Sequence, residues 1–368
     1  MYKKFHLIYI LGAIVVATAE WGTTQRIFGQ TNAYVVRDLS RDDSSEVPSK
    51  LNNLGDIAGR AVIAGEGGTR ATTWKHSGVK SKHLGVLLGG DYSSAAGIND
   101  AGQVAGASNT SEAILPFLWT ATGGLKRVPL LSGDSCGQAT GINKQGDIAG
   151  YSSGPNGVRA FLWTRKAGVR DLGVLAGGDY SRARDLNDLD DVVGTSASSA
   201  GERAVLWTKA GSIRDLGTLP GDWASEATAI NNAGNIVGCS KGPAGLRAFI
   251  WSKESGMQAL GVLPGGASSR ALDISDLGEV VGSSTSASGE HAFVWTRQTG
   301  MTDLNGADAL NLGVVFVEAH AINSKGEILV MGRSAEEGDM NSATASTAGQ
   351  HCAPAPPSTF LLTPSKAR

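Results

Sequence analysis

Six tryptophans recur at a nearly constant interval along this chain of 368 residues, and this interval restricts the possible folds more than any other feature. They are separated by 45, 44, 44, 44 and 44 residues: Trp74, Trp119, Trp163, Trp207, Trp251 and Trp295. Each ends a short apolar stretch such as Ala160-Phe161-Leu162-Trp163. The chain is therefore built of repeats, and we expect the tryptophans in the core, filling the gaps between packed sheets.

A second marker runs in step with the tryptophans. It is an Asn-x-x-Gly turn, in which Asn caps the turn and Gly adopts a positive φ. Seven copies begin at Asn52, Asn99, Asn143, Asn187, Asn231, Ser275 (the variant) and Asn323. An Asp-Leu-Gly or a related triplet follows most tryptophans.

Each repeat can be divided into four short strands. Strand a precedes the Asn, as at 94–98, and strand b follows the turn, as at 103–107. Strand c ends in the Trp, and strand d follows, as at 169–172. Four strands in about 44 residues indicate a β-propeller blade. The frequent glycines interrupt any stretch with helical periodicity, which excludes a helical repeat.

The two ends of the chain complement each other. Residues 33–39 match strand d but have no a, b or c before them, and residues 359–363 match strand c but have no d after them. Pairing them removes an exposed edge strand and completes a blade. We therefore predict an all-β fold, a single seven-bladed β-propeller over residues 33–364. Six or eight blades stay open, because the first unit is degenerate and an insertion follows Gly332.

The segments outside the repeats have compositions of their own. Residues 1–19 resemble a secretory signal peptide: Lys3 and Lys4 precede an apolar stretch that ends in Ala17-Thr18-Ala19. A membrane anchor is the alternative, but about 13 apolar residues fall short of the ~20 that a span needs. We expect a secreted protein without an anchor after cleavage, with a spacer at 20–32, a flexible insertion at 335–357 and a tail at 365–368.

Charge and cysteine content exclude several classes of protein. The formal net charge is -2, and no basic tract is present, which argues against a nucleic-acid partner. The three cysteines, Cys136, Cys239 and Cys352, are an odd number, and none forms a Cys-x-x-Cys pair. The sequence therefore predicts no disulfide framework and no thiolate metal site.

The repeat resembles the bacterial extracellular HAF-repeat proteins. His291-Ala292-Phe293-Val294-Trp295 is the signature that gives the family its name, and residues 215–251 and 360–364 are also similar. The resemblance implies export and a repeat fold, and it implies no established reaction or ligand. Arginine takes the His place elsewhere (Arg70, Arg159, Arg203 and Arg247), which argues against a metal-binding or catalytic role for that His.

The d–a connections, which join strand d of one blade to strand a of the next, contain a recurring acid and aromatic residue. These candidate ligand-binding residues are Asp91, Tyr92, Asp134, Asp179, Tyr180, Asp222 and Trp223. Propeller topology puts the start of strand c on the same face, with Arg159, Arg203, Arg247 and His291. Carboxylates beside aromatic rings suit a sugar or a peptide. The alternative is a structural connection capped by its Asp.

Other chemistry has weaker support. The run Asp185–Asp191 is rich in acidic residues, but it lacks the Gly and Glu spacing of a calcium-binding loop. No Gly-x-Ser-x-Gly motif and no His pair at ligand spacing occurs. We predict no catalytic residues, no metal and no cofactor.

The sequence thus predicts a secreted, non-enzymatic binding or scaffold protein, monomeric, whose unknown extracellular ligand is a glycan or a peptide. One alternative is a propeller hydrolase or lyase that acts on extracellular polysaccharide or peptide, and another is a purely structural cell-surface module. A periplasmic or cell-surface location is the alternative to release from the cell. Clustered carboxylates of raised pKa in a central funnel favour the enzyme. Equivalent shallow pockets between blades favour lectin-like binding.

Overall fold

The computed structural model describes residues 34–39, 46–63, 68–76, 81–306, 312–335 and 358–365. Ala33–Arg368 forms one compact unit. The predicted signal peptide, the spacer, the insertion from residue 336 to 357 and the tail from residue 366 onward lie outside the described residues. Nowhere in the described ranges does a helix have the length and apolarity required to cross a membrane.

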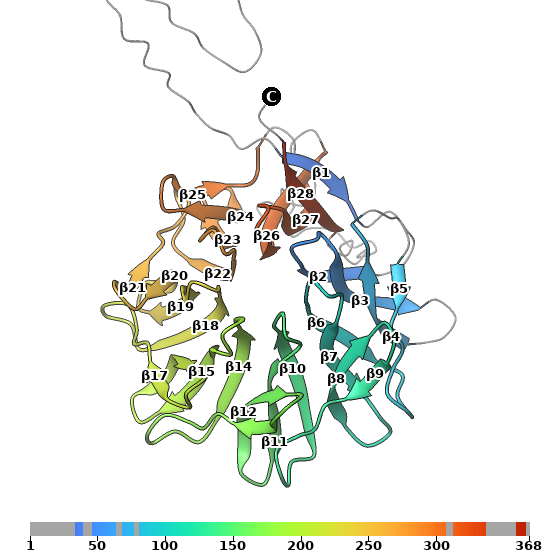
Figure 1. Ribbon diagram of the computed structural model, residues 1–368. Coiled ribbons are helices and arrows are strands. Elements are labelled where there is room, and N and C mark those ends of the chain that lie inside the picture. Colours follow the sequence, from blue (N-terminus) through green and yellow to red (C-terminus); the bar gives the residue numbers. More distant parts are fainter. Residues whose placement is uncertain are drawn as a thin grey trace, which may run out of the picture. The chain divides into compact units, whose positions relative to one another are not determined.

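The described chain forms seven antiparallel four-stranded sheets arranged as a ring (Figure 1). Blade 1 is β2(Glu46–Leu51), β3(Ile57–Ile63), β4(Gly68–Trp74) and β5(Ser81–His83). Blade 2 is β6(Ser93–Ile98), β7(Val104–Asn109), β8(Ile114–Thr120) and β9(Gly124–Arg127). Blade 3 is β10(Cys136–Ile142), β11(Ile148–Gly154), β12(Gly157–Thr164) and β13(Gly168–Asp171). Blade 4 is β14(Ser181–Leu186), β15(Val192–Ser198), β16(Gly201–Trp207) and β17(Ile213–Asp215).

The remaining blades continue the order. Blade 5 is β18(Ala224–Ile230), β19(Ile236–Gly242), β20(Gly245–Ser252) and β21(Gly256–Ala259). Blade 6 is β22(Ser269–Ile274), β23(Val280–Ser286), β24(Gly289–Thr296) and β25(Gly300–Asp303). Blade 7 is β26(Val314–Ile322), β27(Ile328–Ser334), β28(Ser358–Pro364) and β1(Tyr34–Asp38). The prediction of seven four-stranded blades is confirmed.

Blade 7 closes the ring with strands from both ends of the chain. β1 is the outer strand of this sheet, and it runs antiparallel to β28 from the pair Tyr34–Pro364 to the pair Asp38–Phe360. Tyr34 and Val36 also pack against the core of blade 7. The orphan strand d and the missing strand d are therefore the same element, as the sequence predicts.

The core lies between neighbouring blades. Trp207, 2% exposed, packs with residues of blades 3 and 4 in one cluster. Trp74, Trp119 and Trp251 are also buried, whereas Trp163 and Trp295 are partly buried against neighbouring clusters. Because each tryptophan fills the space between two sheets, the repeat length is fixed by how the blades stack.

Candidate functional site

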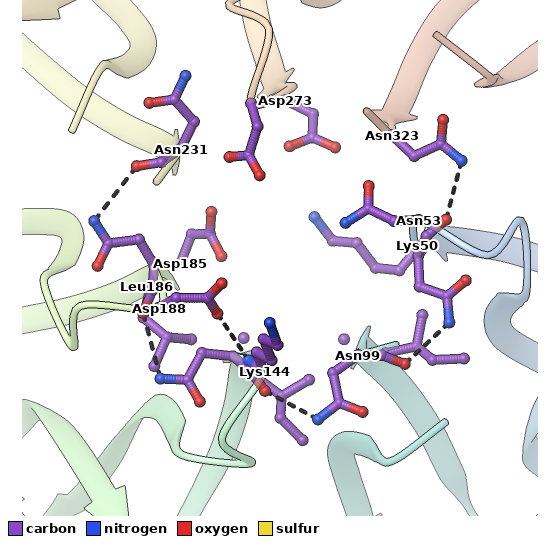
Figure 2. A pocket seen from close by; sticks show the side chains of 18 of the residues that line it. Lys50, Asn53, Asn99, Lys144, Asp185, Leu186, Asp188, Asn231, Asp273 and Asn323 are labelled. Atoms are coloured by element: carbon purple, nitrogen blue, oxygen red, sulfur yellow. Dashed lines mark hydrogen bonds between the residues drawn. The ribbon is translucent and has the colours of Figure 1, made fainter. Parts of the chain in front are cut away.

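The first strand of each blade lines the central channel, and each contacts the first strands of both neighbouring blades (Figure 1). A cavity of about 430 Å³ lies at the face formed by the turns between first and second strands, here called the turn face. All seven blades contribute to its wall, each through the end of its first strand and the start of its turn. Figure 2 looks into this cavity.

A ring of asparagines holds the wall of the cavity together. In five turns the Asn side-chain oxygen accepts the backbone N–H groups two and four residues ahead, as Asn52 does from Leu54 and Asp56 at 3.0 and 2.9 Å. Asn99 accepts the group four residues ahead, from Gln103 at 3.0 Å. The predicted turn cap is therefore confirmed. The Asn amide nitrogen then donates to the backbone carbonyl of the equivalent residue in the next blade. These donors, at 2.9–3.4 Å, are Asn52, Asn99, Asn143, Asn187, Asn231 and Asn323.

A second layer of hydrogen bonds joins the residues that follow these asparagines at the cavity rim. A side-chain oxygen here accepts the backbone N–H of the equivalent residue in the preceding blade, as when Asp188 accepts from Lys144 at 2.9 Å. Asp100, Asn232, Asp276 and Asn53 act in the same way, at 2.8–3.0 Å. The two layers fix the geometry of the rim without any ligand.

One position breaks the sevenfold pattern. It lies two residues before each Asn, and its seven occupants are Lys50, Gly97, Gly141, Asp185, Ala229, Asp273 and Ala321. Four blades thus have a side chain of one carbon or none, and three have a charge. Figure 2 shows Lys50, Asp185 and Asp273 reaching into the cavity from blades 1, 4 and 6.

A β-bulge directs these charged side chains. In blade 4 the pairing of β14 with β15 shifts between Ala183 and Asp185, and blades 1 and 6 shift at the equivalent place. A bulge adds one residue to its strand and re-aims the side chain that follows. Gly141 of the neighbouring blade leaves space for the Asp185 side chain, because a Cβ at position 141 would lie 3.2 Å from Asp185 Oδ1.

Backbone groups of the next blade hold both carboxylates in place. Asp185 Oδ2 accepts the N–H of Ile230 at 3.0 Å, and Asp273 Oδ2 accepts the N–H of Ile322 at 3.0 Å. Burial raises the pKa of Asp185 to about 6; the Lys50 charge acts to lower this pKa, and the Asp273 charge acts to raise it. Burial also raises the pKa of Asp273, again with Lys50 opposing.

The raised pKa of Asp185 predicts a pH-dependent cost in stability. The carboxyl ionises near pH 4 in the unfolded chain but near pH 6 in the folded chain. Folding therefore favours the protonated carboxyl, and the free energy of unfolding falls as the pH rises from about 4 to 6 and Asp185 ionises in the folded chain. We expect Asp185→Asn to raise this free energy by about 3 kcal/mol at pH 7.5 and to leave it unchanged near pH 4.

Urea unfolding at the two pH values measures this effect. Glu254→Gln, which alters an exposed carboxylate in the turn between β20 and β21, is the control. An Asp185→Asn effect of the same size at pH 4 and pH 7.5 would contradict the assignment.

The d–a connections lie on the face opposite the cavity, because each first strand begins there and ends at the turn face. Asp91, Asp179 and Trp223 are exposed, and Tyr92, Tyr180 and Asp134 are partly buried. Several of these side chains bond to side chains of the blade strands beside them. Asn109 donates to Asp91, the Ser152 hydroxyl to Asp134, and the Tyr180 hydroxyl to Glu202.

The basic residues of the third strands hold the same connections. Arg159 donates to the backbone carbonyl of Asp179, and Arg203 to that of Trp223 at 2.7 Å. Arg247 pairs with Asp222 at 2.7 Å, and this carboxylate is 1% exposed. His291 Nδ1 instead lies 2.6 Å from Asp303 Oδ2 of its own blade. The structure thus brings these predicted residues to one face, where the three arginines join a blade to a d–a connection.

The acidic side chains of the run considered for calcium, residues 185–191, each bond to donors of the protein itself. Asp188 accepts from Lys144, Asp191 accepts the N–H of Lys209, and Asp190 pairs with the Lys209 ammonium at 2.8 Å. Asp190 also has a φ of 62°, where the other repeats have the turn glycine. Among the described residues, no group of three or more His, Cys, Asp or Glu is placed to hold a metal ion. Cys239 is buried, and Cys136 is partly buried.

Sequence reasoning missed Lys50, Asp185 and Asp273 as a set. The signal was present: aligning the repeats on their Asn and reading the column two positions earlier separates these three residues from four glycines and alanines. Comparing motifs hides this column, because it lies just outside the conspicuous Asn-x-x-Gly turn.

No protein-family model and no curated protein matches this chain. Among solved structures, it is similar to a catalytically inactive virginiamycin B lyase from Staphylococcus aureus with quinupristin (TM-score 0.51, 10% identity, 90% of this chain and 99% of that one). It is also similar to the β-propeller domain of the Trilobed protease from Pyrococcus furiosus, described as having an open velcro topology (TM-score 0.52, 8% identity, 80% of this chain and 90% of that one). TolB from Acinetobacter baumannii matches with a TM-score of 0.42 and 13% identity, over 58% of this chain and about half (53%) of TolB. At these identities the likeness shows the fold alone.

Proposed function

We propose that this chain is a secreted, non-enzymatic binding protein whose ligand enters the cavity at the turn face. One observation carries the proposal: Lys50, Asp185 and Asp273 depart from the repeat at a single position, and all three line one cavity of about 430 Å³. Its size is that of a small-molecule or side-chain site. The resemblance to the HAF-repeat proteins and the predicted signal peptide support export.

The charges are not needed to build the blades. Blades 2, 3, 5 and 7 form the same first strand with Gly97, Gly141, Ala229 and Ala321 at this position. Burying a carboxylate costs free energy unless it is paired. A ligand that bonds to these carboxylates adds to the backbone N–H groups that already hold them and offsets more of that cost, so the site fits a binding role better than a purely structural one.

The chemistry of the wall suits the binding of a polar ligand. Of the described residues that line the cavity, none is His or Cys, and the side chains are carboxylates, amides, lysines, hydroxyls and aliphatic groups. Such a set orients a polar ligand by hydrogen bonds and charge. The d–a connections are the other candidate surface for a glycan or peptide, and the same experiment separates the two faces.

The test is a screen of the chain from Glu20 onward on a glycan array and a peptide library, followed by affinity measurements on variants. We expect the double variant Asp185→Asn/Asp273→Asn to weaken binding at least about tenfold, while its amide oxygens still accept the backbone N–H groups. The matched control, Asp91→Asn/Asp179→Asn on the opposite face, should bind as the wild type does.

Three other outcomes have distinct meanings. Loss of binding in the Asp91→Asn/Asp179→Asn control with normal binding in the cavity variant would move the site to the d–a connections. Normal binding in both double variants would contradict both sites. The absence of any glycan or peptide ligand would favour a structural module.

A second candidate, a hydrolase or lyase, rests on one specific observation. Asp185 and Asp273 come from different blades, share a central cavity and have raised pKa values, which is the arrangement expected of paired acid and base groups. Incubation with polysaccharide and peptide substrates, with product analysis, tests it. Turnover in the wild type that Asp185→Asn and Asp273→Asn each abolish would replace the binding proposal with this one.

A further inference from the structure

The turn face has exposed leucines next to the charged cavity. The third residue of the turn is Leu54 in blade 1, Leu189 in blade 4 and Leu277 in blade 6, with exposed fractions of 52%, 57% and 72%. These are the same three blades that carry Lys50, Asp185 and Asp273. Each leucine directly follows a residue that lines the cavity, so the three surround its rim. We call Leu54, Leu189 and Leu277 the rim leucines.

The turns hold the rim leucines in fixed positions. The backbone N–H groups of Leu54 and Leu189 each donate to the turn asparagine at 3.0 Å. The turn of Leu277 is closed by a bond from the Gly278 N–H to the Ser275 carbonyl at 2.9 Å. Binding to side chains on fixed turns costs less conformational entropy than binding that must first order a loop. The rim leucines thus offer three apolar contacts at fixed places beside the cavity.

The charge of the cavity selects the chemistry of the partner. The lining contains two lysines and five aspartates, so a positive group is attracted to the mouth: Lys50, Lys144, Asp100, Asp185, Asp188, Asp273 and Asp276. The same carboxylates repel the anionic lipids that a membrane surface presents. The combination of apolar contacts at the rim and negative charge at the centre is complementary to a protein segment with a basic residue between apolar ones.

We infer that the ligand is a basic segment of a partner protein, which places one Lys or Arg side chain in the cavity and packs its flanking apolar side chains on the rim leucines. This inference rests on the proposed binding function. Asp185 and Asp273 accept hydrogen bonds from the ammonium or guanidinium group, as carboxylates do in charge-assisted pairs. The apolar contacts supply the remaining affinity and determine how the segment lies across the turn face.

The test uses the chain from Glu20 onward and three libraries of short peptides, which have Lys, Gln or Glu at the centre and varied residues on both sides. We expect the Lys library to yield the binders, with Leu, Ile, Phe or Met enriched at the flanks. The triple variant Leu54→Ser/Leu189→Ser/Leu277→Ser should weaken the selected peptides at least about tenfold. Leu88→Ser, in a d–a connection and 98% exposed in the wild type, is the matched control and should bind normally.

Failure of this inference is distinguishable from failure of the proposed function. Equal binding of the Lys, Gln and Glu libraries, or normal peptide binding by the triple variant, overturns the inference. So does the absence of peptide binders combined with binding of glycans, or of vesicles of phosphatidylcholine with phosphatidylglycerol. If those ligands are lost in Asp185→Asn/Asp273→Asn, the cavity is still the binding site and the proposed function stands.

Discussion

Removal of β1 is expected to destabilise the whole propeller, not one blade alone. β1 pairs with β28 over its five residues, and Leu39 adds a backbone bond to the Thr359 carbonyl at 2.9 Å. The backbone hydrogen bonds, at a net value of about 1 kcal/mol each, and the partly buried side chains of Tyr34 and Val36 together contribute on the order of 5 kcal/mol. This is close to the whole free energy of unfolding of many domains.

The experiment compares two truncated chains, one beginning at Ala33 and the other at Ser40. The first keeps β1 and should unfold at the same urea concentration as the chain from Glu20 onward. The second should unfold at a much lower concentration and should self-associate in sedimentation measurements, because β28 becomes an unpaired edge. Equal stability of the two truncated chains would mean that three strands of blade 7 are enough to close the ring.

The fold could be predicted from the sequence because each blade contacts its neighbours through the same positions. Trp207 packs against blades 3 and 4, and its counterparts occupy equivalent places, so one physical requirement recurs every 44 residues. Closure could also be predicted, since the two terminal strands are each incomplete without the other. The observed β6 and β13 differ from the expected 94–98 and 169–172 by one residue at the ends.

The candidate site could not be predicted in the same way, because it consists of departures from the repeat. Lys50, Asp185 and Asp273 are 88 or more residues apart in the sequence, and they meet only because seven first strands converge. Their direction depends on a β-bulge, which the alternation of apolar and polar residues does not show. The repeated acids of the d–a connections are more conspicuous in the sequence, and they led to the opposite face.

The asparagine ring likewise has one role that the sequence predicts and one that it does not. Turn capping is local, so the Asn-x-x-Gly motif predicts it directly. The bond from the Asn amide to the next blade spans 44 residues for Asn99 and Asn231 and 271 residues for Asn323, so it becomes visible only once the ring is closed. This second role requires an amide, which Asn supplies at six of the seven positions and which Gly, Asp or Ser cannot supply.

Replacing one asparagine of the ring is therefore expected to cost far more than the loss of a turn cap. In Asn231→Ala, the N–H groups of Ala233 and Asn235 lose their acceptor, and the Ser275 carbonyl loses a donor at 3.0 Å. Unsatisfied buried groups cost about 1–3 kcal/mol each, so we expect the free energy of unfolding to fall by about 3 kcal/mol. Urea unfolding measures it, and a change below about 0.5 kcal/mol, typical of a surface site, would contradict the role.

The natural exception in the ring supplies the matched control. Ser275 accepts the Glu279 N–H at 3.2 Å but has no amide with which to reach the Asn323 carbonyl of blade 7. Asn231→Ser should therefore cost less than Asn231→Ala, because the hydroxyl keeps one acceptor. Ser275→Asn supplies the seventh donor and should raise the free energy of unfolding by about 1 kcal/mol. A destabilising Ser275→Asn would show that blade 6 has no room for the amide, and that the ring is complete with six.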